Sequence, residues 1–362
     1  MFKHIFLLMT LVLALMGNSA FAVEVKGLDQ ASVPVASRSV ADKNAALKAA
    51  LAAVVVKNTG DETVLQNPVI AAQLNNPDAF LVQFGYEDQE GQLYLKGQFD
   101  ERRVVQLLRQ AQVPVWGKQR PLVLVWLATQ DAQQQRTLLS DASMSDIRKL
   151  FKQDADAQGL PLLFPLMDLD DMMQVSEADV RGNFPSAIYQ ASTRYHADYF
   201  ALASIQPLVD GRQSYRFYLY PMKQDETMWR PLLQLEQTVS ADGDAVADMV
   251  TGLSQYFVSQ YAVTDSGAGE LVDVTFDGID SMTRLTALET YVAQLAVARS
   301  AVIASIQGNR VTFRFTLYGT PEDLARQLGL ESRLQRIDTT VTADLASPRV
   351  PSAVTSMEYH WQ

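Results

Sequence analysis

The sequence predicts a protein of mixed α+β and α/β class, in which a central α/β domain on a mixed sheet lies between two ferredoxin-like modules of β-α-β-β-α order. Near both ends of the chain, two stretches of alternating apolar residues follow each other across a polar turn, as in a β-hairpin. Each pair comes after a stretch in which apolar residues recur at helical spacing. The middle of the chain contains residues 121–128, which are apolar on both faces as a buried central strand must be.

The first module is predicted at residues 23–117. It opens with an extended stretch at 23–36, after which Ser39 can cap a helix and Gly60 can end it. A hairpin over residues 80–99 and a short second helix follow. Phe80, Val82, Phe84 and Tyr86 alternate along the first strand of the hairpin, and Leu93, Leu95, Gly97 and Phe99 along the second. One face of the first helix carries Leu47, Ala50, Leu51 and Val54, and the second helix is expected to turn Val104, Leu107 and Leu108 inward.

The central domain is predicted at residues 118–264, where strands and helices alternate and antiparallel strands follow. Ser143 and Asn183 are expected to cap its first two helices, and Gly159 to end the first. The apolar residues of a last helix recur from Val246 to Phe257. The strands are expected at residues 121–128, 160–166, 199–205, 215–219 and 232–235.

The third module is predicted at residues 268–338 and repeats the element order of the first. Asp280 can cap its first helix, and Pro321 suits the first turn of its second. Its strands are expected at residues 271–276, 301–306 and 311–317, with a short edge strand at 334–337. Residues 339–362 contain two prolines and many small polar residues, so we expect them to form a flexible tail.

The beginning of the chain predicts export. Lys3 is followed by an apolar run and then by small residues two apart, the pattern of a signal peptide cleaved after Ala22. The apolar run is shorter than the ~20 residues that a membrane span needs. We therefore expect a periplasmic protein, with residues 1–22 removed and no stable membrane insertion.

The composition excludes several classes of site. The chain has no cysteine and only three histidines, so cysteine nucleophiles and cysteine- or histidine-rich metal sites are excluded. It has no phosphate-binding glycine loop, and we expect no cofactor. Its formal net charge of −11 makes nucleic acid a poor partner.

One acidic cluster is a candidate site. Asp168, Asp170 and Asp171 follow the apolar stretch 160–166, at the end of a strand where α/β sheets often bind ligands. A calcium loop needs regularly spaced ligands and a glycine, and no glycine follows before Gly182. We expect a solvated loop that could bind a ligand, with no catalytic or metal-binding residue in it.

Aromatic residues suggest a possible interface. Arg216, Tyr218 and Tyr220 would share one face of their strand, which suits a protein interface if that face is open. The alternative is an ordinary sheet face covered by a helix. Trp361, near the end of the expected tail, could dock into a partner. His196 lies where a helix meets a strand, and we expect it to cap the helix end.

Three motifs carry a resemblance to a known family. VPVWGKQRPLVLVWLA at residues 113–128, LPLLFPLMDLDD at 160–171 and ASTRYHADYFALASI at 191–205 resemble the bacterial family called domain of unknown function 2066. The resemblance extends over nearly all of the chain after the leader and implies export in a Gram-negative bacterium. The middle module is also similar to the α/β domain of the TolB amino-terminal part and of the curli secretion subunit, which implies a role in envelope assembly.

Two functions of different class remain open from the sequence. The first is a non-enzymatic periplasmic scaffold or adaptor that binds other envelope proteins. The second is a hydrolase that cleaves cell-wall glycans with two carboxylates, which sequence spacing alone does not exclude. A concave pocket with two close carboxylates would favour the hydrolase, and open sheet surfaces would favour the adaptor.

Overall fold

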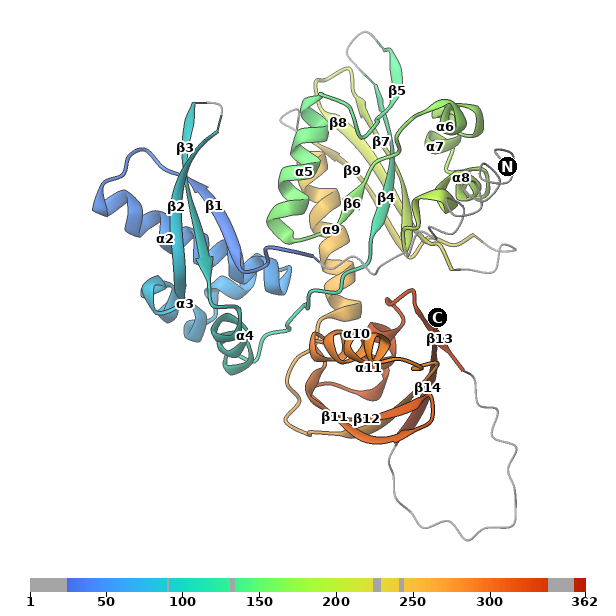
Figure 1. Cartoon of the computed structure of the whole chain (residues 1–362). Helices are drawn as coiled ribbons and strands as arrows, with labels where there is room; N and C mark the ends of the chain where they lie inside the picture. Colours follow the sequence, from blue (N-terminus) through green and yellow to red (C-terminus); the bar gives the residue numbers. More distant parts are fainter. Residues whose placement is uncertain (1–24, 90, 131–133, 224–228, 241–243, 338–354) are drawn as a thin grey trace, which may run out of the picture.

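The computed structural model describes residues 25–89, 91–130, 134–223, 229–240, 244–337 and 355–362. Three separate sheets of three, six and five strands lie around the long helix α9 (Asp244–Tyr261) (Figure 1). The expected mixed class of α/β modules is therefore confirmed. In the part of the chain that is described, no helix has the length and apolar character needed to cross a bilayer. The leader predicted at residues 1–22 lies outside the described residues.

The first module has the predicted element order. β1 (Gln30–Pro34) pairs antiparallel with β3 (Gln92–Phe99), and β3 pairs antiparallel with β2 (Leu81–Gln89). Helix α2 (Val40–Thr59) packs on β1 and β3. The helix begins as expected, because the Ser39 side chain accepts a hydrogen bond from the backbone of Asp42. The short elements that complete the module are η1 (Glu62–Gln66), α3 (Pro68–Leu74), η2 (Pro77–Ala79) and α4 (Glu101–Gln110).

The middle module is a six-stranded sheet between two helical layers. Its strand order is β5-β4-β7-β8-β9, with β6 also paired to β4. β4 and β7 are parallel, whereas β7, β8 and β9 are antiparallel, so the sheet is mixed as predicted. The strands are β4 (Val123–Gln130), β5 (Arg136–Leu138), β6 (Leu162–Leu163), β7 (Tyr199–Pro207), β8 (Gln213–Pro221) and β9 (Leu233–Val239).

Two cores hold the layers of the middle module together. On one face, α5 (Asp146–Gln158) and α9 cover a core that contains Phe151, Phe217 and Phe257. On the other face, a second core contains Trp126, Ile188 and Phe200. The helices and the turn on this second side are α6 (Leu169–Gln174), α7 (Glu177–Arg181), α8 (Pro185–Ser192) and η3 (Thr193–Tyr195).

Several local expectations for the middle module were wrong. Ser145, two residues after the expected Ser143, accepts the capping hydrogen bond of α5. Asn183 does not cap α8, because it has a φ of 55° and Phe184 occupies the cap position without a side-chain bond. The strand expected at 160–166 is reduced to two residues, since only Val123 and Leu124 of β4 pair with it.

The third module contains the predicted split β-α-β unit and one strand that the sequence did not predict. Its elements are β10 (Leu271–Asp277), α10 (Met282–Ala293), β11 (Ala298–Gln307), β12 (Arg310–Leu317), α11 (Pro321–Leu328), β13 (Leu334–Arg336) and β14 (Thr355–Trp361). Ser281, one residue after the expected Asp280, caps α10. The strand order is β11-β12-β10-β14-β13.

The expectation of a flexible tail at residues 339–362 is wrong for its last part. β14 lies between β10, to which it is parallel, and β13, to which it is antiparallel. Its inward side chains Met357, Tyr359 and Trp361 are 9%, 2% and 3% exposed and belong to the core of the module. Residues 339–354 of the expected tail lie outside the described residues.

Two arginines fix the three modules to one another. Arg120 is 2% exposed and donates hydrogen bonds at 2.5–3.1 Å to five carbonyl oxygens. Two of these oxygens, those of Lys57 and Gln158, lie in the last turns of α2 and α5, where a positive charge is favourable. Arg109 of α4 donates to the carbonyl oxygens of Val263 and Ala296 and so joins the first module to the third.

Gly60 places the end of α2 directly against α9. Its φ of 66° ends the helix, and the side chain of Ser254 donates a hydrogen bond of 3.2 Å to its carbonyl oxygen. A Cβ atom at this position would lie 2.5 Å from Val258, so a side chain would separate the two helices. The modules therefore pack closely around α9.

Candidate functional site

The acidic cluster forms the start of a helix instead of the solvated loop that we expected. Asp168 is the N-cap of α6, and its side chain accepts a hydrogen bond of 3.1 Å from the backbone of Asp171. Carboxylates are favourable in the first turn of a helix because the helix dipole is positive there. The three acidic residues are thus brought together by local helix geometry.

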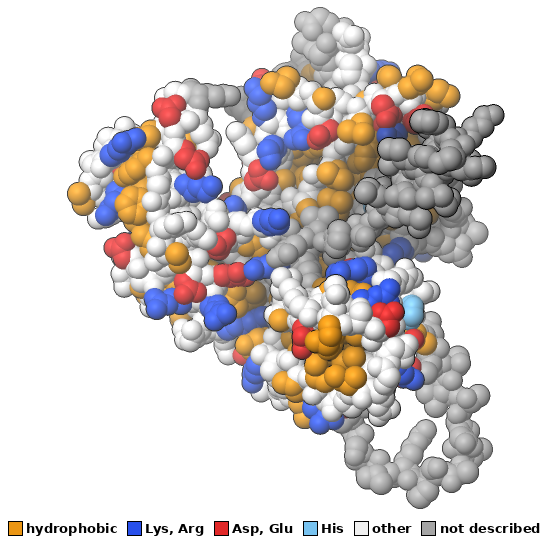
Figure 2. Space-filling model, in the orientation of Figure 1, with side chains coloured by type: hydrophobic (Ala, Val, Ile, Leu, Met, Phe, Trp, Pro, Cys, Tyr) orange, Lys and Arg blue, Asp and Glu red, His pale blue; other side chains and the backbone are white. Residues whose placement is uncertain are grey.

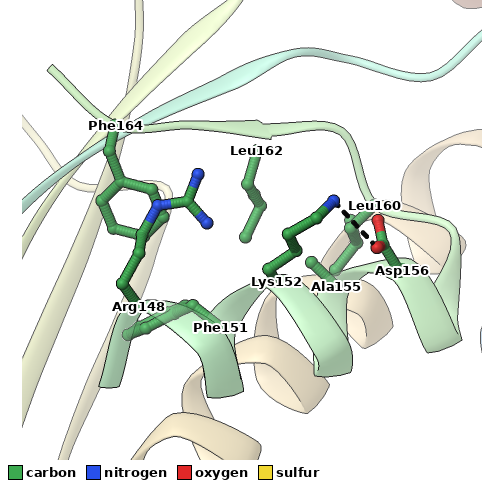
Figure 3. A pocket seen from close by; sticks show the side chains of 8 residues that line it. All are labelled: Arg148, Phe151, Lys152, Ala155, Asp156, Leu160, Leu162 and Phe164. Carbon is green, nitrogen blue, oxygen red and sulfur yellow. Dashed lines mark hydrogen bonds and ion pairs between the residues drawn. The ribbon is translucent and has the colours of Figure 1, made fainter. Parts of the chain in front are cut away.

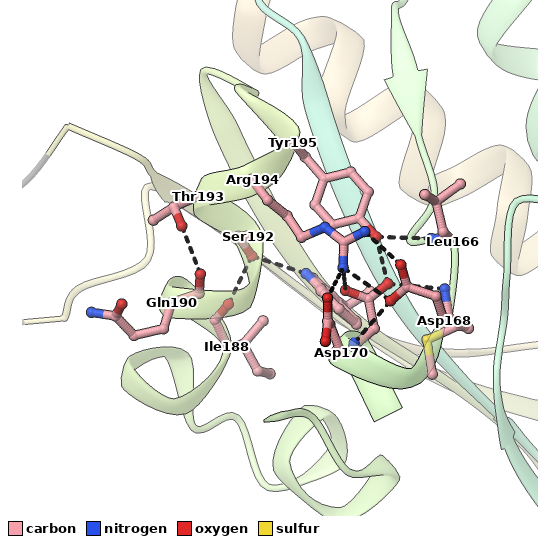
Figure 4. Close-up of polar contacts among 12 residues, drawn as sticks. Leu166, Asp168, Asp170, Ile188, Gln190, Ser192, Thr193, Arg194 and Tyr195 are labelled. Carbon is pink, nitrogen blue, oxygen red and sulfur yellow. Dashed lines mark hydrogen bonds and ion pairs between the residues drawn. The ribbon is translucent and has the colours of Figure 1, made fainter. Parts of the chain in front are cut away.

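Arg194 closes this cluster from a distant part of the chain (Figure 4). Its two terminal nitrogens donate to both oxygens of Asp168, at 2.9 and 2.6 Å. The same guanidinium donates to Asp171 at 3.3 Å and lies 3.9 Å from Asp170. Sequence reasoning missed Arg194, because it lies in η3, more than twenty positions away.

Asp171 is the buried centre of this network. It has no exposed surface, and one of its oxygens accepts hydrogen bonds from Tyr195 and from the backbone of Met167, the latter at 2.9 Å. Tyr195 in turn accepts a hydrogen bond of 2.9 Å from the backbone of Leu166. The network therefore ties the chain before α6 to η3.

The pKa values in the network follow from these contacts. The hydrogen bonds from Arg194 lower the pKa of Asp168 to about 2. Burial, together with the hydrogen bond to Asp171, raises the pKa of Tyr195 to about 12. At neutral pH Asp168 is therefore an ion-paired carboxylate, and Tyr195 is a neutral phenol.

This arrangement suits structural support better than metal binding or catalysis. A cation at the cluster would compete with Arg194, Tyr195 and backbone amides for the carboxylate oxygens. Among the residues that the structure describes, no group of three or more histidine, cysteine or acidic side chains is placed to hold a metal ion. Asp170 is the most exposed of the three acidic residues and points to solvent.

The second predicted site, the face of β8, is covered. Tyr220 is 1% exposed, stacks on Phe200 at 5.4 Å and donates a hydrogen bond of 3.0 Å to Asn183. Arg216 donates to the carbonyl oxygen of Arg181 in α7. Tyr218 is half-buried and packs against the same core. This strand face is therefore an ordinary one covered by helices, the alternative to an interface that the sequence had left open for Arg216, Tyr218 and Tyr220.

Trp361 and the two histidines of the described chain also have local roles. Trp361 is buried in the third module under the guanidinium of Arg333, 4.4 Å from its ring, so it is not free to dock into a partner. His196 is the C-cap of η3 with a φ of 50°, as expected for a residue at the end of a helical turn. His360 lies 3.2 Å from Asp277 on the outer face of β14.

Two hollows on the described surface remain as candidate sites. The smaller, of about 60 Å³, lies between α5 and β6 (Figure 3). There the Arg148 guanidinium covers the ring of Phe164, and Lys152 is paired with Asp156 at 3.1 Å. Because its charged groups already have partners in the chain, this hollow has little capacity for a ligand.

The larger hollow has a volume of about 380 Å³ and lies between α10 and the edge strand β11. Six of its nine lining residues are apolar, among them Val292, Ile303 and Phe313, and Glu289 is its one carboxylate. Cavities of this size are typical of binding pockets. Figure 2 shows apolar side chains gathered on this module near α10 and α11, while charges of both signs are interspersed over the rest of the visible face.

Family models match the chain at both ends. Residues 22–117 match DUF8605, a domain of unknown function, and residues 270–361 match DUF2066. The predicted family, DUF2066, is therefore confirmed only for the third module. The motifs that suggested it lie at residues 113–205, outside the DUF2066 match, and the resemblance does not cover nearly the whole chain as expected.

Comparison with individual proteins adds little. No curated protein matches the chain. Among solved structures, formyltetrahydrofolate deformylase from Burkholderia mallei ATCC 23344 is 11% identical over 53% of this chain and 87% of that protein. Its TM-score of 0.14 is too low to support an argument about fold or function.

Proposed function

We propose that this chain, which carries a DUF8605 domain at residues 22–117 and a DUF2066 domain at 270–361, is a periplasmic adaptor that binds other envelope proteins without catalysis. The observation that carries the proposal is that each of these modules has an open edge strand. β2 is at the edge of the first sheet, and β11 is at the edge of the third.

An open edge strand can pair with a strand of another protein. Its outward backbone amides and carbonyls have no partner in the sheet, and an added strand satisfies them. Both edges also have exposed apolar side chains, with Val82 and Phe84 on β2 and Val302 and Ile306 on β11. Such surfaces favour protein partners over small polar substrates.

The packing of the modules around α9 supports the same function. Arg109 and Arg120 donate seven hydrogen bonds to backbone carbonyl oxygens, and those to Lys57, Val263 and Ala296 hold the first module against the other two. Two edge strands on one rigid body keep a constant separation. An adaptor that joins two partners needs this property, because the geometry decides whether both can bind together.

Export is the other half of the proposal and rests on the leader pattern of residues 1–22. Mass spectrometry of the periplasmic fraction should find Val23 as the first residue. A protein that retains Met1, or that is found entirely in the membrane pellet, would contradict this location.

A cross-linking experiment tests the adaptor function. A photo-reactive amino acid replaces Val302, Val82 or, as a control, Val209, which is fully exposed in the turn between β7 and β8. After irradiation of intact cells, we expect a defined adduct with an envelope protein from positions 302 and 82 and none from position 209. Equal labelling at all three positions would contradict docking at the edges.

The alternative of a carboxylate-dependent hydrolase is less well supported by the geometry. Glycoside cleavage needs two carboxyl groups about 5–10 Å apart on either side of the scissile bond. The two hollows described above hold one carboxylate each, Asp156 and Glu289. Release of fragments from purified peptidoglycan, abolished by Glu289→Gln without unfolding, would overturn the adaptor proposal.

A further inference from the structure

The cavity between α10 and β11 continues into an open strand edge. Ala301 and Ile303 of β11 lie opposite Phe315 and Phe313 of β12, so these four side chains share the face that the helices cover. Above Ile303 and Phe313, however, the helix does not fill the space, and the cavity of about 380 Å³ remains. A strand added to β11 would place alternate side chains at this cavity.

The edge of β11 has little protection against pairing. Between Arg299 and Arg310 it contains no charged residue and no proline, the residues that usually protect an edge strand. Val302 is 57% exposed and Ile306 is 56% exposed. Arg299 near its start and two register shifts against β12 are the protective features of this strand.

The rim of the cavity has one free charge, and it is negative. Glu289 has neither a hydrogen bond nor an ion pair within the described part of the chain. Arg299, the other charged residue of the rim, pairs with Asp265 at 3.0 Å and lies 5.0 Å over the ring of Tyr318. A bound segment therefore meets the apolar side chains of Ile303 and Phe313 beside an uncompensated carboxylate.

The edge formed by β2 is different from that formed by β11. Along β2, Lys43 covers the ring of Phe84 at 5.7 Å, and Arg38 covers that of Tyr86 at 5.2 Å. These cations occupy the apolar face of β2, and a basic segment would be repelled there. The two edges should thus select different partners.

We propose that the groove formed by α10 and β11 binds an extended segment of a partner protein that has an aliphatic residue with a lysine or arginine two positions away. The segment adds to β11 as a sixth strand, since its backbone pairs with the free edge. The aliphatic side chain enters the cavity above Phe313. The basic side chain, on the same face because alternate residues point the same way, pairs with Glu289. This inference rests on the adaptor function proposed above and specifies its partner.

A labelled peptide of sequence TKTITKT tests the chemistry on the full chain after leader removal. It puts one isoleucine between two lysines on a single face of a strand. Fluorescence anisotropy should show saturable binding, and a TETITET peptide should bind at least ~10-fold more weakly, which corresponds to about 1.4 kcal/mol. Glu289→Lys reverses the charge and should weaken the binding of TKTITKT by a similar factor. Ala301→Phe fills the cavity and should weaken its binding to the same extent.

The control is Glu270→Lys, which reverses an exposed charge next to β10, outside the cavity lining, and should change the Kd less than ~2-fold. Thermal melts of all variants exclude unfolding as the cause. Equal binding of the two peptides, or unchanged binding to Glu289→Lys, would overturn the proposal. So would a dimer, seen by light scattering, that Val302→Lys dissociates, because β11 would then pair with a second copy of the chain.

The cross-linking experiment separates this inference from the adaptor function. If the peptide does not bind but position 82 still gives an adduct, the groove proposal is wrong and the adaptor function stands. If neither edge gives an adduct, both are wrong.

Discussion

At the residue scale, Arg120 is buried without a carboxylate partner among the residues that the structure describes. Its five hydrogen bonds go to backbone carbonyl oxygens, and its guanidinium lies 4.0 Å over the ring of Trp116. Burial lowers the pKa of Arg120 to about 9, so the group keeps its charge at neutral pH. The charge is stabilised by the negative ends of two helices instead of an acid.

Arg120→Met should therefore be strongly destabilising. The substitution keeps most of the volume but leaves buried carbonyl groups without a donor, and each such group costs about 1–3 kcal/mol. We expect the free energy of unfolding to fall by about 3–5 kcal/mol in urea denaturation. Arg212→Met is the control, because Arg212 is exposed and pairs with Asp210 alone. A loss below about 1 kcal/mol for Arg120→Met would contradict this role.

The acidic cluster contains a buried and an exposed aspartate side by side, so the two can be compared by substitution. Asp171 is fully buried and bonded to Tyr195 and Arg194, whereas the side chain of Asp170 is 76% exposed. Asp171→Asn should lower the free energy of unfolding by about 1.5–3 kcal/mol, since hydrogen bonds to a charged group are lost. Asp170→Asn should change it by less than about 0.5 kcal/mol. Equal effects in thermal denaturation would contradict the proposed network.

Asp168 should affect how the free energy of unfolding changes at acid pH. Its pKa is about 2 in the folded chain and about 3.9 when unfolded, so the unfolded state binds the proton first as the pH falls. Its stabilising effect is complete above about pH 4 and is lost as the pH falls through about 2. Denaturation midpoints measured from pH 5 to 2 should fall less steeply in Asp168→Asn. Arg194→Gln should flatten the pH dependence in the same way, and the double variant should flatten it no further than either single variant. Additive effects would show that the two residues act separately.

At the scale of elements, most of the end modules could be predicted from the sequence. Alternation and helical spacing are local properties, and they correctly give the β-α-β-β-α order, the Ser39 cap and the Gly60 end. The acidic cluster was harder. Its helix start is visible in the sequence, but Arg194 and Tyr195 come from another element, and no local pattern connects them to Asp171.

β14 was missed although its signal is present. Met357, Tyr359 and Trp361 alternate with polar residues, as expected of a half-buried strand. The prolines and small residues before them suggested a tail instead. Moreover, β14 lies beside β10, more than eighty residues earlier in the chain, so nothing nearby in sequence indicates its place.

Trp361→Ala tests how much β14 contributes. The side chain is buried in the core of the third module, and removal of a buried tryptophan usually costs about 3–5 kcal/mol. We expect a loss of this size in chemical denaturation followed by tyrosine fluorescence. The neighbouring His360→Ala, on the outer face, should cost less than about 1 kcal/mol because its contact with Asp277 is solvent-exposed. A small effect of Trp361→Ala would mean that the module is stable without this strand.

At the scale of the whole molecule, the modules should unfold together. Arg109 links α4 to two carbonyl oxygens of other segments and lies 4.2 Å over the ring of Tyr318 in the third module. Arg109→Ala removes this connection without touching any module core. We expect the calorimetric transition to broaden or split and the radius of gyration in X-ray scattering to increase. Arg102→Ala, an exposed change on the same helix, should alter neither; a sharp single transition in Arg109→Ala would show that other contacts suffice.

The position of β14 also determines when the third module can be finished during synthesis. A ribosome makes β10 and β13 before β14, so neither of these flanking strands can pair with β14 until β14 has been synthesised. A polypeptide interrupted anywhere before residue 355 keeps a gap in the middle of this sheet, with apolar side chains from both neighbours exposed. Proteases recognise such surfaces, so incomplete copies should be degraded while complete ones persist. Resistance of the protein to degradation in the cell thus depends on the translation of β14.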